Sequence, residues 1–199
     1  MTIPTTKKGL ATKITRFKTL FKKEYESYGF ISDGKGKRYF LFILLFLLGN
    51  DLKSLDYFQW YEREFPDDIG EPFQKLCWAL TLYRMGRIKD AEYRLADTIL
   101  SNIYLIPALI DKPVKKVDML HGSNYAEPDY IYYLPDEIID AITESDLGWL
   151  AEFYSSKIIQ KILKRHIEIF FQLQNVRKVE LRKPLVRESR SLIDELLSS

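Results

Sequence analysis

The chain has 199 residues, of which 46% are hydrophobic and 29% are charged. That balance is typical of a globular domain and excludes an intrinsically disordered chain. The single cysteine, Cys77, excludes an internal disulfide and a cysteine-ligated metal cluster, and it is interpreted as a small buried hydrophobic residue. The longest apolar run, Tyr39 to Leu48, is half the roughly 20 residues that a membrane-spanning helix needs. Since the N-terminus also lacks the apolar core of a secretory signal, we expect a cytoplasmic protein.

The net charge of +2 hides a strong asymmetry along the chain. Residues 1–23 contain seven Lys or Arg and no acidic residue, residues 24–156 have a net charge of −10, and residues 157–190 have a net charge of +7. The two basic ends could pack on the acidic middle. They could also form a surface for an anionic partner, either nucleic acid or an anionic membrane.

Apolar residues at helical spacing predict a first amphipathic helix over residues 10–28, with a Lys-rich outer face. It could cap a stack of helices, lie on an anionic membrane surface, or serve as an organellar presequence; the capping role is favoured because the aromatic stripe continues without a break. After a loop over residues 29–38, further helices are expected over about 37–48, 52–64, 73–85 and 89–102.

The region from 106 to 134 is predicted to be a long irregular connection, because prolines and turn-forming residues interrupt it. A short helical turn is expected near 114–120. Three helices then follow, over about 135–144, 145–175 and 185–197. The long helix has two apolar stripes, which suggests that neighbouring helices or a second subunit contact it on two sides, and a homodimer through residues 146–175 is one alternative. No strand-like alternation occurs, so the fold class is all-α.

Two segments, within residues 39–66 and 73–100, align on their turn glycines, which are 37 residues apart. In this alignment Gly49 matches Gly86, Ser54 matches Ala91 and Phe58 matches Leu95. A glycine suits a tight turn, a small residue suits a close helix crossing, and large residues fill the space between them. The pattern predicts two antiparallel helix hairpins.

The second of these segments resembles the tetratricopeptide repeat family. Ala79 stands at the small position of its first helix, Gly86 closes the turn, Ala91 is the small residue where the helices touch, and Leu95 follows as the large one. The first segment keeps the turn glycine and the large residues but has Phe42 and Ser54 at the small positions. The resemblance implies a right-handed stack of hairpins over 37–105 within a single domain of residues 1–199, and residues 135–199 depart from it as added C-terminal helices.

In that family the first helices of the hairpins line a groove that usually receives a peptide. The resemblance assigns to this groove Tyr39, Ile43, Phe46, Phe73, Leu76, Leu80, Tyr83 and Arg84. Because most of these side chains are apolar, we expect either that the chain's own N- or C-terminal helix fills the groove or that the ligand is an apolar helix. Self-filling is favoured, since an open apolar area of this size promotes aggregation.

No catalytic motif is recognised. The spacing of Gly29, Gly34 and Lys35 approaches a phosphate-binding loop, but Gly36 stands where a Ser or Thr is needed for Mg²⁺, so that function is excluded. His121 lies in the irregular connection and could belong to an enzyme site there, whereas His166 is interpreted as a partly buried structural residue. Asp136, Asp140 and Glu144 recur every four residues and are interpreted as a solvated face or a docking surface for a basic partner.

The sequence therefore predicts a non-enzymatic module that binds an unknown protein or peptide. Association with nucleic acid or an anionic membrane through the basic terminal helices is the alternative. No metal or cofactor is expected.

Overall fold

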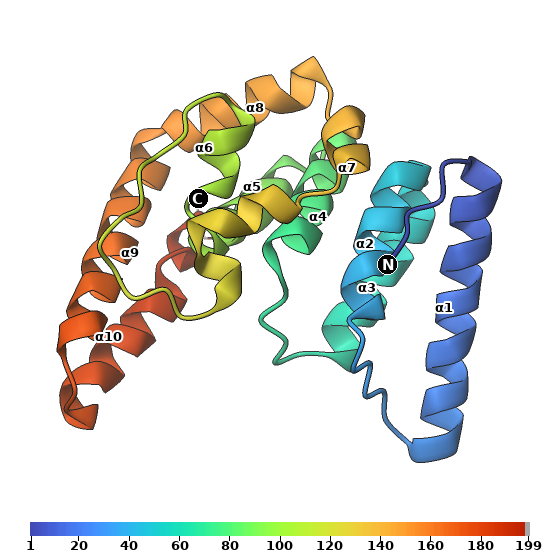
Figure 1. The fold of residues 1–199 in the computed structure, drawn as a ribbon, viewed down its shortest axis with the longest axis horizontal. Coiled ribbons are helices and arrows are strands. Elements are labelled where there is room, and N and C mark those ends of the chain that lie inside the picture. Colours follow the sequence, from blue (N-terminus) through green and yellow to red (C-terminus); the bar gives the residue numbers. More distant parts are fainter. Residues whose placement is uncertain (198–199) are drawn as a thin grey trace.

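The computed structural model describes residues 1–197, which contain helices and no β-strand, so the all-α fold class is confirmed. The α-helices are α1 (Lys7–Tyr28), α2 (Lys37–Leu48), α3 (Asp51–Glu64), α4 (Pro72–Arg84), α5 (Ile88–Ser101), α6 (Leu105–Leu109), α7 (Asp136–Ala141), α8 (Glu144–Ser155), α9 (Lys157–Asn175) and α10 (Val179–Ser191). The short 3₁₀ helices are η1 (Asn124–Ala126), η2 (Pro128–Tyr133) and η3 (Asp194–Leu197). Together they form an arch, with α1 at one end and α9 and α10 at the other (Figure 1).

Helix α4 is the centre of the core. All its residues from Pro72 to Leu82 are buried, and α5, α2 and α3 pack against it. Pro72 occupies the first helical turn, where its missing N–H costs no hydrogen bond. Glu71 and Gln74 form a capping box, in which each side chain accepts a hydrogen bond from the other residue's backbone N–H, both at 3.1 Å.

The hairpin of α4 and α5 is the closest helix pair of the structure. Gly86 adopts φ +74° in the turn, a conformation that favours glycine, and Arg87 N–H donates to the carbonyl of Leu82 at 3.0 Å. Ala79 and Ala91 have no exposed surface, and Leu95 is fully buried as well. The small side chains let the two backbones approach, as the alignment of the sequence predicts.

The hairpin of α2 and α3 is held apart by aromatic rings. Gly49 closes α2 with φ +64°, and the Asn50 side chain caps α3 by accepting a hydrogen bond from Lys53 N–H at 3.0 Å. Phe42, at a position where the second hairpin has a small residue, stacks on Phe58 with ring centres 5.0 Å apart and also contacts Trp78 at 5.0 Å. Rings of this size keep α2 and α3 from crossing as closely as α4 and α5 do.

Helix α1 covers the outer side of α2. It begins three residues earlier than expected, because the Thr6 hydroxyl accepts a hydrogen bond from Gly9 N–H at 3.1 Å and caps the helix. Its apolar stripe is buried against α2 and consists of Leu10, Ile14, Phe17 and Phe21. The helix thus lies at the end of the stack (Figure 1).

The connection from 110 to 134 is irregular, but polar contacts fasten it to the core. The Asn102 side chain accepts hydrogen bonds from Tyr104 N–H and Leu105 N–H and donates to the carbonyls of Tyr125 and Glu127. The short helical turn expected near 114–120 is absent. That prediction rested on a few apolar residues and on no capping residue. The helical turns that do form are α6, η1 and η2.

The prediction of a single long helix over 145–175 is wrong. Ser156 adopts extended backbone angles (φ −65°, ψ 146°) and divides the segment into α8 and α9. Its hydroxyl accepts a hydrogen bond from Ile159 N–H at 3.4 Å, so it caps the second helix. Within the chain α8 contacts α6 and α9 contacts α5 and α10, and most of the two apolar stripes is buried, while Tyr154, Ile158, Ile167 and Phe170 stay partly exposed.

The last helix also begins earlier than expected. Pro184 was predicted to precede it, but α10 starts at Val179 and contains Pro184 in its second turn. Arg182 joins the start of α10 to the end of α9, because its guanidinium donates to the carbonyls of Leu173 and Val176 at 2.6 and 2.7 Å. Among the described residues, no helix is both long and apolar enough to cross a membrane.

We predict that Ala91→Leu lowers the free energy of unfolding by about 1–3 kcal/mol, because the larger side chain overpacks the crossing of α4 and α5. Urea unfolding followed by circular dichroism measures the change. Ala151→Leu, on the partly exposed side of α8, is the matched control and should change stability by less than about 0.5 kcal/mol. Equal effects of the two substitutions would show that the crossing tolerates a larger residue.

Candidate binding cleft

The eight side chains predicted to line a groove lie on α2 and α4, which pack together, and the chain itself covers most of them. Ile43, Phe46, Phe73, Leu76 and Leu80 are buried, and Tyr39, Tyr83 and Arg84 are held by polar or ring contacts. The segments that cover this side of α4 and α2 are η2, α7 and α8. These residues are therefore covered from within the chain, whereas the N- or C-terminal helix was expected to do this, and their assignment to a repeat-type binding groove stays a prediction.

Ring stacking attaches two of the covering segments to α4. Phe73 stacks on Tyr130 of η2, and Tyr83 stacks on Trp149 of α8, each pair with ring centres 4.3 Å apart. The Tyr130 hydroxyl also donates a hydrogen bond to the buried carboxylate of Glu71. Phe73 and Tyr83 thereby gain ring partners within the chain that an open groove would leave to a ligand.

Arg84 connects the end of α4 to the start of α8. Its guanidinium donates to both carboxylate oxygens of Asp146, at 2.6 and 3.2 Å, and to the carbonyl of Ala141 at 2.6 Å. The Asp146 side chain is 1% exposed. Burial alone would raise the pKa of Asp146, but hydrogen bonds from Arg84 and Thr143 outweigh it and hold the pKa below its usual range.

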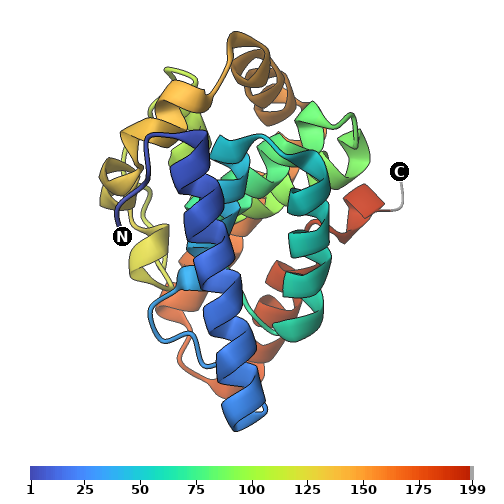
Figure 2. The same ribbon diagram turned by 90° about the vertical axis from the view of Figure 1, so that its right-hand side faces the viewer.

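An open cleft lies instead between α1 and α3. Figure 2 shows these two helices side by side toward the viewer. The volume of the cleft is about 710 Å³. The side chains that line it are Lys18, Phe21, Lys22, Tyr25, Glu26, Ile31, Asp56, Tyr57, Gln59, Trp60, Arg63 and Glu64. The two walls are formed by α1 and α3, and both of these helices pack against α2.

The floor of the cleft is aromatic. Trp60 of α3 stacks on Phe21 of α1 with ring centres 5.5 Å apart and on Tyr57 at 5.3 Å. The Tyr57 ring is almost fully buried, and its hydroxyl donates to the carbonyl of Arg38 at 2.7 Å. Tyr25 completes the wall on α1 and is 53% exposed, so the cleft offers an accessible ring as well as buried ones.

The two rims carry different charges. Lys18 and Lys22 lie on the α1 rim, where Lys22 is 3.7 Å from Glu26. Asp56 and Glu64 lie on the α3 rim, where Arg63 pairs with Glu64 at 3.1 Å. Partial burial lowers the pKa of Lys18, and the nearby carboxylate of Asp56 opposes that shift. The result is an apolar floor between a mainly basic and a mainly acidic edge.

His121 is held by contacts within the chain. Its side chain is 5% exposed, its Nε2 lies 3.0 Å from the Tyr104 hydroxyl, and its Nδ1 lies 4.0 Å from a carboxylate oxygen of Glu127. The Tyr104 hydroxyl also accepts a hydrogen bond from Val117 N–H at 3.0 Å. This set of contacts fastens the irregular connection to the core.

His166 is buried in α9, where its ring stacks on Phe170 with centres 4.4 Å apart. Its Nδ1 has no hydrogen-bond partner among the residues that the structure describes. Burial lowers the pKa of His166 to about 4. The ring is therefore neutral near pH 7.

The glycine-rich loop before α2 has no room for a phosphate at the helix N-terminus. Asp33 is buried there, and its carboxylate accepts hydrogen bonds from Lys37 N–H at 2.9 Å and Arg38 N–H at 2.7 Å. The amides that would hold an anion are thus already occupied. Across residues 1–197, no group of three or more His, Cys, Asp or Glu is placed to hold a metal ion.

The acidic residues predicted on one helical face are divided between two elements. Asp136 and Asp140 lie on α7, whereas Glu144 begins α8 after a two-residue break. All three are exposed. The solvated-face interpretation is thus consistent with their position.

The cleft side chains were not singled out from the sequence. Tyr25 and Phe21 were assigned to one helical stripe, and Trp60 was not assigned a role. The signal that could have found them is an excess of aromatic residues on α3, where Tyr57, Trp60 and Tyr61 exceed what one core-facing stripe needs. The position of α1 opposite these aromatic residues of α3 depends on a long-range contact, which periodicity does not specify.

No protein-family model matches this sequence, and neither a curated protein nor a solved structure matches it. The tetratricopeptide resemblance of residues 73–100 therefore stays a prediction from the residue pattern. Function has to be argued from the surfaces of this chain alone.

We predict that Arg84→Ala lowers the free energy of unfolding by about 2–4 kcal/mol, because it leaves the buried carboxylate of Asp146 without its cation. Arg87→Ala, which breaks only the exposed pair of Arg87 with Asp90, is the control and should cost less than about 1 kcal/mol. Denaturant unfolding of both variants gives the comparison. Similar losses would mean that the Asp146 pair contributes no more than a surface contact.

We predict that His166 makes stability depend on pH. The unfolded chain binds a proton at His166 near pH 6.5, whereas the folded chain does so only near pH 4, so stability is full above pH 6.5 and falls as the pH drops between these values. The expected contribution is a loss of about 2 kcal/mol between about pH 7.5 and pH 5. Urea unfolding of the His166→Leu variant across this pH range should show a loss of stability that is smaller by this contribution. The same slope in the variant would contradict the assignment.

Proposed function

We propose that this chain is a non-enzymatic protein-interaction module, built on tetratricopeptide-like hairpins, that binds an amphipathic helix of a partner protein in the α1–α3 cleft. The observation that supports this most is the cleft between α1 and α3, where the partly exposed Trp60 and the 53% exposed Tyr25 lie over the buried rings of Phe21 and Tyr57. A third helix laid along such a groove buries apolar residues at i, i+3, i+4 and i+7. The groove that the resemblance assigns is filled by the chain, so it offers no comparable surface.

The charges of the rims favour one class of ligand helix. Lys18 and Lys22 on the α1 edge match acidic residues on one flank of the ligand, and Asp56 and Glu64 on the α3 edge match basic residues on the other. Between them, Tyr25 and Trp60 offer the kind of aromatic contact that dominates binding at protein interfaces. The proposed ligand therefore has an apolar stripe with acids on one side and bases on the other.

Site-specific photocrosslinking tests the proposal in two steps. A photoreactive phenylalanine analogue at the exposed position Gln59, at the cleft, should crosslink a partner segment with this helical pattern. The same analogue at Tyr132, which is 80% exposed on η2, is the control position. A synthetic peptide of the crosslinked segment should then bind the purified chain and gain helicity on binding.

In the second step, Tyr25→Ser should weaken binding of that peptide by at least about tenfold, because it removes an aromatic contact. Tyr132→Ser removes an even more exposed tyrosine outside the cleft and should leave the affinity unchanged. Identical crosslinks from both positions, or an affinity that Tyr25→Ser does not change, would rule out the cleft as the binding site. Binding of a small molecule in place of a peptide would contradict the proposed ligand class.

A further inference from the structure

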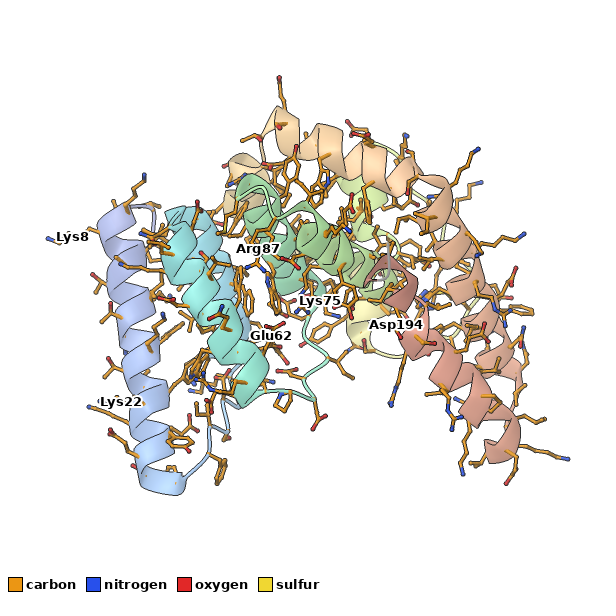
Figure 3. The ribbon with its side chains drawn as sticks, turned by 180° about the vertical axis from the view of Figure 1, so that it is seen from behind. Lys8, Lys22, Glu62, Lys75, Arg87 and Asp194 are labelled. Atoms are coloured by element: carbon orange, nitrogen blue, oxygen red, sulfur yellow. The ribbon has the colours of Figure 1, made fainter. Side chains whose placement is uncertain are left out.

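The turn that joins α9 to α10 lies at an extremity of the arch, far from the α1–α3 cleft (Figures 1 and 3). Residues 177–190 contain six basic residues and two acidic ones. One of the acids, Glu188, is already paired with Arg165, whose guanidinium donates to both of its carboxylate oxygens at 2.6 and 2.9 Å. The positive charge of this segment is therefore mostly uncompensated within the chain.

One face of α10 concentrates this charge. Val179, Arg182, Lys183, Val186, Arg187 and Arg190 line a shallow hollow of about 430 Å³. Arg182 is engaged with the carbonyls at the end of α9, but Lys183, Arg187 and Arg190 are exposed and form no ion pair with any carboxylate that the structure describes. Three cations thus point to solvent from about two turns of one helix.

Large apolar side chains are exposed around the turn, and one of them, Val179, lines the same hollow as the cations. Phe171 at the end of α9 is 46% exposed, and Val179 and Leu181 at the start of α10 are each 57% exposed. They lie within eleven positions of the sequence, on either side of the turn. Exposed apolar residues in a cationic surrounding are the combination that binds the interface of an anionic bilayer, where apolar side chains enter the headgroup region and cations contact phosphates.

The basic helix at the opposite end also exposes apolar side chains, with Leu20, Tyr25 and Tyr28 being 40%, 53% and 70% exposed, so α1 is the surface against which the α9–α10 turn has to be compared. Along α1 the positions between the lysines include Thr12, Thr15 and Thr19, each of which donates its hydroxyl to a backbone carbonyl four residues earlier. Lys8 lies on that far side of the molecule in Figure 3. The two basic ends are separated by the arch and do not pack on each other, so they can be tested independently.

We propose that the α9–α10 turn and the basic face of α10 dock this protein on an anionic phospholipid bilayer. A nucleic acid is the less favoured ligand, because none of the residues that line the hollow has an aromatic ring on which a base could stack. The inference is independent of the proposed cleft, since the two surfaces share no residue.

Sedimentation of the full chain with vesicles tests the proposal. The chain should sediment with vesicles of phosphatidylglycerol and phosphatidylcholine but not with phosphatidylcholine alone, and binding should weaken as salt rises. The triple substitution Lys183→Gln, Arg187→Gln and Arg190→Gln should reduce binding by at least about tenfold. The matched control Lys7→Gln, Lys8→Gln and Lys23→Gln removes the same charge from α1 and should leave binding nearly unchanged.

A dye at the turn reports insertion directly. Val179→Cys can carry an environment-sensitive fluorophore, because the native Cys77 is fully buried and does not compete for the label. Its emission should shift to the blue with anionic vesicles, whereas the same dye at Lys8→Cys should not shift. No sedimentation with anionic vesicles, equal losses from the two triple variants, or binding to duplex DNA or RNA without binding to vesicles would each overturn the proposal.

Discussion

The burial of α4 on every side is the constraint on which the rest of the structure depends. A helix whose residues from 72 to 82 are all buried needs neighbours around its whole circumference and partners for each polar side chain. Lys75, which lies in the middle of the molecule in Figure 3, reaches Asp97 and Ser101 at 2.8 and 2.7 Å. The Thr81 hydroxyl donates to the carbonyl of Cys77 at 2.7 Å. The neighbouring helices are therefore fixed both by apolar packing and by these internal polar contacts.

Polar contacts between distant residues hold the segments that have few apolar residues of their own. Arg38 pairs with the carboxylates of Asp33 and Asp68, and Tyr39 donates to Asp68 at 2.6 Å, so the loop before α2 is joined to the turn before α4. Arg84 likewise joins the end of α4 to the start of α8 through the carboxylate of Asp146. Since each of these charges is at least partly buried, removing one partner leaves the other unsatisfied. This explains how an arch with long irregular connections retains one arrangement.

Because η2, α7 and α8 cover the inner side of the arch, the surfaces proposed for binding lie at its two ends. Between them the covering segments η2, α7 and α8 bring an excess of acidic side chains to the surface, whereas α1 and α10 carry the basic ones. The chemistry of the two ends differs, with an aromatic floor between rims of opposite charge at one end and exposed aliphatic residues among unpaired cations at the other. A module arranged in this way can contact two different kinds of partner at once, as our two proposals suggest.

The sequence by itself determined the elements whose signals are local. The apolar period of α2, the glycines at 49 and 86 and the small residues at 79 and 91 act within one helix or one turn, so they specify the all-α class and the α4–α5 hairpin. Only the tertiary structure decided which surfaces stay open. The break at Ser156, the inclusion of Pro184 in α10, the covering of the groove by Tyr130 and Trp149 and the meeting of Phe21 with Trp60 depend on contacts between residues far apart. Periodicity identifies which face of a helix is apolar but not which element buries it, and for this reason the candidate cleft could not be found from the sequence.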